Sequence, residues 1–85
     1  MNTLEQSTRE TAAALRDMID KAGRESLATL SHKPLDVAEF RLDKHYKAGT
    51  ITLAQYRRLD EKVFGLHCLV TMEIDDEQGF QPMTV

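Results

Sequence analysis

The stretch that decides the fold is residues 49–56, which read GTITLAQY. Thr52 and Gln55 are three residues apart, the spacing of a capping box in which each side chain satisfies a free backbone N–H at the start of a helix. Ile51 and Tyr56 flank the box at the spacing of a hydrophobic staple. The sequence therefore predicts a tight turn at this point, with a helix that begins directly after it.

The segment upstream of this turn predicts a second helix, over about residues 36–48. Asp36 and Glu39 have the spacing of another capping box, and Gly49 is suited to end the helix in a left-handed conformation. A connection this short makes the two helices neighbours, as a hairpin or as a more open corner.

The first helix is expected over about residues 3–22. Thr3 and Gln6 form a capping box at its start, and Gly23 is placed to end it. A hinge over 23–35 then follows, because its last residues disfavour a helix before a proline.

Beyond the turn, two interpretations remain open. Apolar residues step by three and four from residue 56 to 70, which predicts one long helix from 53 to about 77. Alternation of apolar and polar residues in 66–74 instead predicts a strand, which would form a β-hairpin at about 66–85 and make the fold α+β. We favour the long helix because its period continues unbroken from a capped start.

The expected fold is mainly α: one small domain over residues 1–85, with a central helical hairpin and a long third helix. A chain of 85 residues with a single cysteine has a thin core and no disulfide, so association with another chain is expected. The third helix, at about 37 Å, outreaches the other two predicted helices. Its apolar seam would bury against the first helix, another copy or another protein. The expected interface residues are Tyr56, Leu59, Val63, Leu66, Val70 and Ile74.

Charge is distributed unevenly along the chain. Residues 1–31, 32–59 and 60–85 carry net charges of −1, +3 and −5. A helix-turn-helix that binds DNA is the alternative function, because Thr52, Gln55 and Arg58 would face base edges from the second helix of the pair. The basic patch expected in the middle segment comprises Arg41, Lys44, Lys47, Arg57 and Arg58.

Reactive side chains do not form a recognisable site in the sequence. His67 and Cys68 are adjacent, so they point in different directions on a helix or a strand, and Cys68 is expected to be buried and inert. His32, His45 and His67 are too dispersed for a ligand set and are expected on the surface. We therefore expect no catalytic, metal or cofactor site and no enzyme.

Residues 42–65 resemble the SHOCT module, a short helical hairpin associated with oligomerisation. The residues that carry the resemblance are Leu42, Gly49, Ile51, Thr52, Tyr56, Val63, Phe64 and Gly65. The resemblance implies a role in association and no catalysis.

The function expected from these features is that of a small homodimeric protein-interaction module that binds or inhibits another protein, as small phage and plasmid proteins do. The first ten residues are polar, and no apolar run approaches the ~18 residues of a membrane span, so a cytoplasmic protein is expected.

Overall fold

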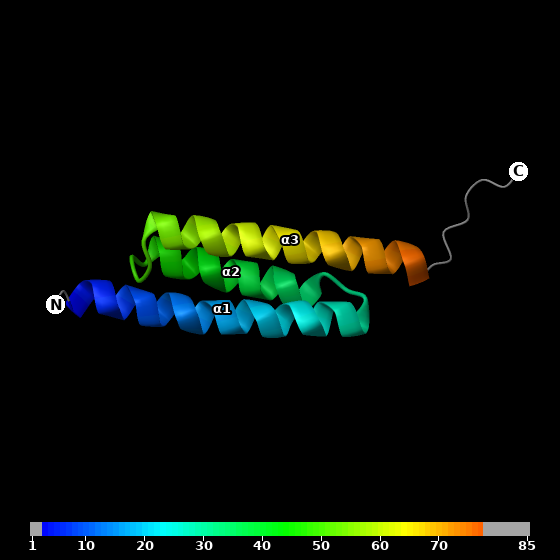
Figure 1. The fold of residues 1–85 in the computed structure, drawn as a ribbon, viewed down its shortest axis with the longest axis horizontal. Coiled ribbons are helices and arrows are strands. Elements are labelled where there is room, and N and C mark those ends of the chain that lie inside the picture. Colours follow the sequence, from blue (N-terminus) through cyan, green and yellow to red (C-terminus); the bar gives the residue numbers. More distant parts are fainter. Residues whose placement is uncertain (1–2, 78–85) are drawn as a thin grey trace, which may run out of the picture.

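A computed structural model, which describes residues 3–77, shows three α-helices packed side by side (Figure 1). They are α1 (Thr3–Thr29), α2 (Lys33–Lys47) and α3 (Leu53–Glu77). Each helix contacts both others, and α2 runs antiparallel to α1 and α3. The mainly α fold is confirmed. Residues 66–77 are helical, so the alternative strand is absent there, and the rest of the alternative hairpin lies outside the described residues.

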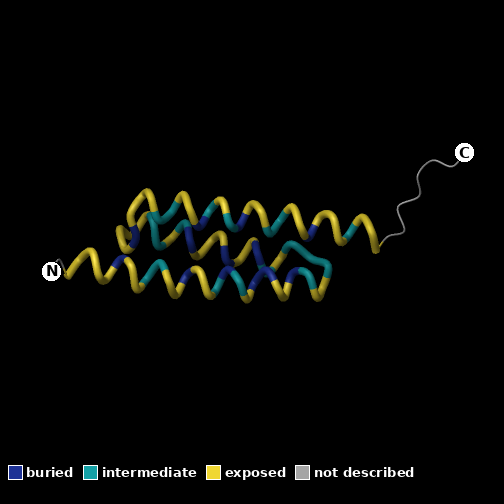
Figure 2. The backbone as a smooth tube through the Cα atoms, viewed as in Figure 1, coloured by how far each residue is buried: buried dark blue, intermediate teal, exposed yellow. Residues whose placement is uncertain are grey.

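The core is made of aliphatic residues. The buried positions of each helix lie on the side that faces the other helices (Figure 2). Their spacing of three, four and seven residues gives each helix one apolar face. None of the helices within residues 3–77 has the length and apolar character needed to span a membrane. The buried core residues are Leu15, Ile19, Ala22, Leu35, Ala38, Leu42, Ile51, Leu59, Val63 and Val70.

The turn between α2 and α3 has the predicted capping box. The Thr52 N–H donates to Gln55 Oε1 at 2.8 Å, and the Gln55 N–H donates to Thr52 Oγ1 at 3.1 Å. Gly49 has a φ of +77°, and Ile51 is only 3% exposed. Local sequence chemistry thus fixes where α3 begins.

The first helix is longer than predicted, because Gly23 does not end it. Gly23 lies buried inside α1, where a Cβ atom would be 2.9 Å from Leu66 Cδ1 of α3. Its missing side chain therefore allows close packing of the two helices. The helix continues to Thr29, and Leu30 takes the left-handed conformation with a φ of 51°.

The longer α1 gives α3 a partner within the same chain. Its 27 residues correspond to about 40 Å, close to the ~37 Å of α3, so the two helices match in length. In the second half of α3, Val70 is completely buried and Ile74 packs against the core. The expected mismatch in helix length is therefore wrong.

The second helix begins at Lys33, three residues before the predicted start at Asp36. The hinge is correspondingly shorter than the predicted 23–35. Ser26 of α1 explains the early start: its buried Oγ atom accepts a hydrogen bond from the Leu35 N–H at 3.2 Å. This bond replaces a local cap in the first turn of α2. The capping box expected at Asp36 and Glu39 is wrong, because both residues lie inside the helix.

Candidate functional site

Both phenylalanines of the described chain are exposed on the α2–α3 hairpin. Phe40 is 64% exposed and Phe64 is 70% exposed, whereas the core contains only smaller aliphatic side chains. On helical spacing, each phenylalanine lies opposite the buried residues of its own helix. The Lys44 Nζ atom is 5.5 Å from the centroid of the Phe40 ring, a cation–π geometry. We call the surface formed by Phe40, Lys44 and Phe64 the outer face.

Two contacts between α2 and α3 fix how the two phenylalanines are placed. Asp36 faces His67, and Asp43 accepts a hydrogen bond from Tyr56. This antiparallel register places the phenylalanine of α2, midway between the two aspartates, within about one helical turn of the phenylalanine of α3. The two phenylalanines therefore lie at similar heights along the hairpin, each on the side away from the buried residues of its own helix.

The end of the hairpin near the turn is held by an aromatic pair. The rings of Tyr46 and Tyr56 stack with their centroids 4.5 Å apart. The Tyr56 hydroxyl donates to Asp43 Oδ1 at 2.8 Å. This bond, together with burial of the hydroxyl, raises the pKa of Tyr56 to about 12. The same bond, followed by one from Lys47, lowers the pKa of Asp43.

The residues expected to form an interface lie instead in the core of the single chain. Leu59, Val63 and Val70 are at most 6% exposed, and the other three are partly buried against the core. The interface role predicted for this seam would require the bundle to open. The three partly buried residues are Tyr56, Leu66 and Ile74.

The basic patch expected from the sequence is divided among different surfaces. Arg41 lines a groove of about 590 Å³ between α1 and α2. Lys44 covers Phe40, Lys47 pairs with Asp43 at 3.3 Å, and the exposed Arg57 lies on α3. A single recognition surface made of all five side chains is therefore not present.

The remaining patch residue, Arg58, joins a basic groove that the sequence did not predict. The groove, of about 600 Å³, lies between α1 and α3, with Ala12 and Ala13 among its lining residues. Lys62 in this groove pairs with Asp20 at 2.9 Å. The sequence prediction missed two further cationic side chains of this groove, although their seven-residue spacing places both on one side of α1. They are Arg9 and Arg16.

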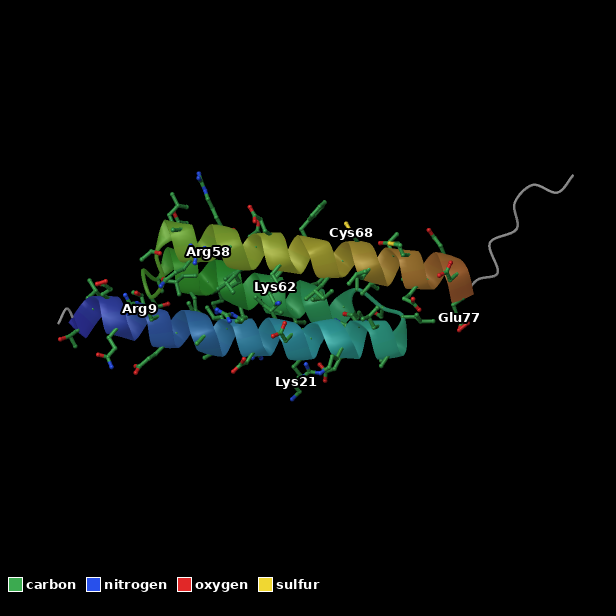
Figure 3. All side chains as sticks on the ribbon, viewed as in Figure 1. Arg9, Lys21, Arg58, Lys62, Cys68 and Glu77 are labelled. Carbon is green, nitrogen blue, oxygen red and sulfur yellow. The ribbon has the colours of Figure 1, made fainter. Side chains whose placement is uncertain are left out.

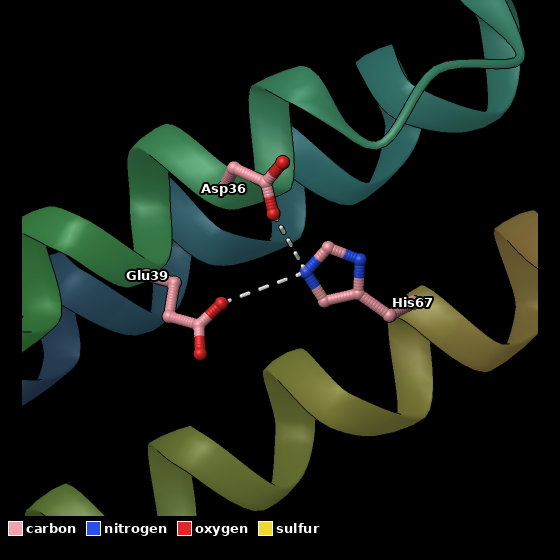
Figure 4. Close-up of side chains that lie close together, drawn as sticks. All are labelled: Asp36, Glu39 and His67. Atoms are coloured by element: carbon pink, nitrogen blue, oxygen red, sulfur yellow. Dashed lines mark ion pairs between the residues drawn. The ribbon is translucent and has the colours of Figure 1, made fainter.

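The prediction of dispersed histidines is wrong for two of the three. His32 Nδ1 lies 2.7 Å from His67 Nδ1, although 35 residues separate them. His67 also faces Asp36 and Glu39 of α2 (Figure 4). His45 lies apart from them and contacts Thr50 at 2.8 Å. The sequence could not show this cluster, because it depends on the pairing of α2 with α3.

Cys68 was expected to be buried, but the structure shows it exposed on α3 (Figure 3). It lies four residues after Phe64, so both residues are on the outward side of the helix. No nucleophile–base pair with His67 forms, because His67 points toward α2. Cys68 therefore lies on the solvent-exposed side of α3.

Comparison with known proteins gives no relative. No family model matches the chain, and neither curated proteins nor solved structures give a significant match.

Proposed function

We propose that this chain is a cytoplasmic protein-interaction module that acts by binding another protein through its outer face. The observation that carries the proposal is the exposure of Phe40 and Phe64, the two largest apolar side chains of the described residues. Aromatic side chains in the centre of an interface commonly supply most of its binding energy. Their placement outside a core of smaller residues favours a role in binding over one in folding.

One cation lies directly on this surface. The Lys44 ammonium lies over the Phe40 ring, whereas Lys47, seven residues after Phe40, is paired with Asp43. A partner with an apolar pocket and an acidic group beside it, placed to meet Lys44, would complement such a surface. Binding that covers a working surface of the partner would make the chain a small regulatory inhibitor of the phage or plasmid type.

Homodimerisation remains part of the proposal, but by a different surface from that first expected. The apolar seam of α3 is covered by α1 and α2, so a second copy would use the outer face and would compete there with the other protein. The resemblance of residues 42–65 to an oligomerisation hairpin supports association in this region, because Phe64 belongs to that segment.

Capture from host lysate tests the proposal. Wild type and a Phe40→Ala/Phe64→Ala variant would each be tagged and exposed to nuclease-treated and untreated lysate. Met72→Ala is the matched control, because Met72 is an apolar residue 61% exposed elsewhere on α3. We expect a discrete protein that survives nuclease and binds to wild type and control, and loses at least ~10-fold in recovery with the double variant.

Two results would contradict this assignment. Equal recovery with the double variant would show that the outer face is not the binding surface. Material that disappears after nuclease treatment, and whose binding is steeply salt-dependent and lost in Arg57→Ala/Arg58→Ala, would instead favour the DNA-binding alternative.

A further inference from the structure

We propose that Asp36, Glu39 and His67 form a binding site for a divalent transition-metal ion, with Zn²⁺ as the best chemical match. The two carboxylates lie on one side of α2, and His67 faces them from α3 (Figure 4). Its Nε2 atom is 3.5 Å from Asp36 Oδ1 and 3.7 Å from Glu39 Oε1. The three ligand atoms all lie within 4.8 Å of one another. One nitrogen and two oxygens from two helices thus converge.

The two separations between His67 Nε2 and the carboxylate oxygens suit tetrahedral coordination. Bonds of about 2.0–2.2 Å from Zn²⁺ to imidazole nitrogen and carboxylate oxygen place neighbouring ligands about 3.3–3.6 Å apart. The separations of 3.5 and 3.7 Å are close to this value. They are long for direct N–H···O hydrogen bonds, which span about 2.7–3.2 Å. The Asp36 and Glu39 side chains are 62% and 51% exposed, so small rotations can complete the geometry.

His32 can hold His67 in the protonation state that a metal requires. The two Nδ1 atoms are 2.7 Å apart, so one must donate and the other accept. When His67 donates, its Nε2 atom carries a free lone pair toward the carboxylates. The other nitrogen of His32 then donates to Thr71 Oγ1 at 3.2 Å. Such a hydrogen bond behind the ligating ring is typical of metal-binding histidines, because it fixes the tautomer.

The opposite proton arrangement describes the same cluster without a metal. His32 would donate to His67, and the His67 Nε2–H would point at the two carboxylates. The two arrangements differ in whether a proton or a cation lies between the nitrogen and the oxygens. Binding of a metal by the isolated chain distinguishes them directly.

The ligand types narrow the choice of ion. Two carboxylates balance the charge of a divalent cation, and an imidazole nitrogen favours zinc and its neighbours over Mg²⁺ and Ca²⁺. Three protein ligands leave a fourth position for water. Because the ligands come from α2 and α3, the bound ion would also link the two helices.

Titration of the tag-free full chain with ZnCl₂ in a calorimeter tests this site. We expect one Zn²⁺ per chain and a rise in the thermal midpoint when Zn²⁺ is present. Asp36→Asn and His67→Ala should each lower the affinity by at least ~100-fold, and His32→Ala by ~10–100-fold. Asp36→Asn keeps the size of an exposed side chain, so it tests the site even where the histidine variants fold poorly.

Two control variants exclude other ligands. His45→Ala removes a histidine that contacts Thr50 rather than the cluster, and Cys68→Ser removes the exposed thiol next to His67. Both should keep the affinity of wild type. The proposal is overturned by absence of binding at one ion per chain, by unchanged affinity in Asp36→Asn, or by loss of affinity in either control.

Discussion

The inner seam between α1 and α3 and the outer face of the hairpin use apolar residues in opposite ways. At the seam, Gly23 brings Leu66 within 3 Å of where a Cβ would be, and Val70 is fully buried. On the outer face, Phe40 and Phe64 are exposed although each is larger than any core side chain. Close approach of the helices leaves room only for small and medium side chains. The fold thus obtains its stability from tight packing of aliphatic side chains and leaves its two phenylalanines on the surface.

The largest effect should come from Leu42, which lies on the inner side of α2 and has no exposed surface. Leu42→Ala should lower the free energy of unfolding by about 2–5 kcal/mol, because it removes buried contacts and leaves a cavity. Phe40→Ala, two residues earlier on the outer side, should change it by only about 0.5 kcal/mol. Urea denaturation followed by circular dichroism measures both. If both variants lost the same free energy of unfolding, the inner and outer sides of α2 would not differ as the structure indicates.

A smaller effect is expected at the start of α2, where Ser26 is completely buried. Ser26→Ala should lower the free energy of unfolding by about 1–3 kcal/mol, because the Leu35 N–H would lose its acceptor in a buried position. Ser31→Ala is the control, since Ser31 Oγ accepts the Lys33 N–H at an exposed position. If Ser31→Ala lowered the free energy of unfolding as much as Ser26→Ala, the stabilising role of the buried hydrogen bond would be contradicted.

The two helical glycines should respond differently to alanine. Gly65→Ala should raise the free energy of unfolding by up to about 1 kcal/mol, because a Cβ there meets nothing within 4 Å and alanine favours helix. Gly23→Ala should raise the free energy of unfolding by less than Gly65→Ala does, since its Cβ would displace Leu66. Thermal denaturation of the two variants makes the comparison. If Gly23→Ala stabilised the chain as much as Gly65→Ala, the packing of α1 against α3 at Gly23 would not be tight.

The smallest effect concerns alkaline pH. The pKa of Tyr56 is raised from its ordinary value of 10.0 to about 12, so the fold favours the neutral hydroxyl. Its contribution to stability is complete below about pH 10 and is lost as the pH rises toward 12. Tyr56→Phe should therefore lose less stability than wild type over this window, as measured by denaturation at several pH values. Parallel losses in both proteins would exclude this role for Tyr56.

Features that depend on neighbouring residues could be predicted from the sequence. The capping box of Thr52 and Gln55 has both partners within one helical turn, so its spacing alone indicated where α3 starts. Gly23 was misinterpreted because local sequence cannot show that Leu66 of another helix packs against it. The early start of α2 was missed for the same reason, since Ser26 acts from α1.

The candidate sites were less predictable than the fold. The seam residues of α3 have the correct period, but the period does not reveal whether their partner is the same chain or another one. The basic groove and the histidine cluster each combine side chains from two helices. The packing of the three helices determines which of these charged and metal-ligating side chains lie close together, and the sequence does not show that packing.

Helix α3 turns one side into the bundle and leaves the opposite side, with Phe64 and Cys68, exposed. The reaction rate of the single thiol with a soluble disulfide reagent tests this arrangement most directly. We expect Cys68 to react in the folded chain at a rate close to that in the unfolded chain. A thiol that reacts only after denaturant unfolds the helices would contradict the account, because this side of α3 would then be buried.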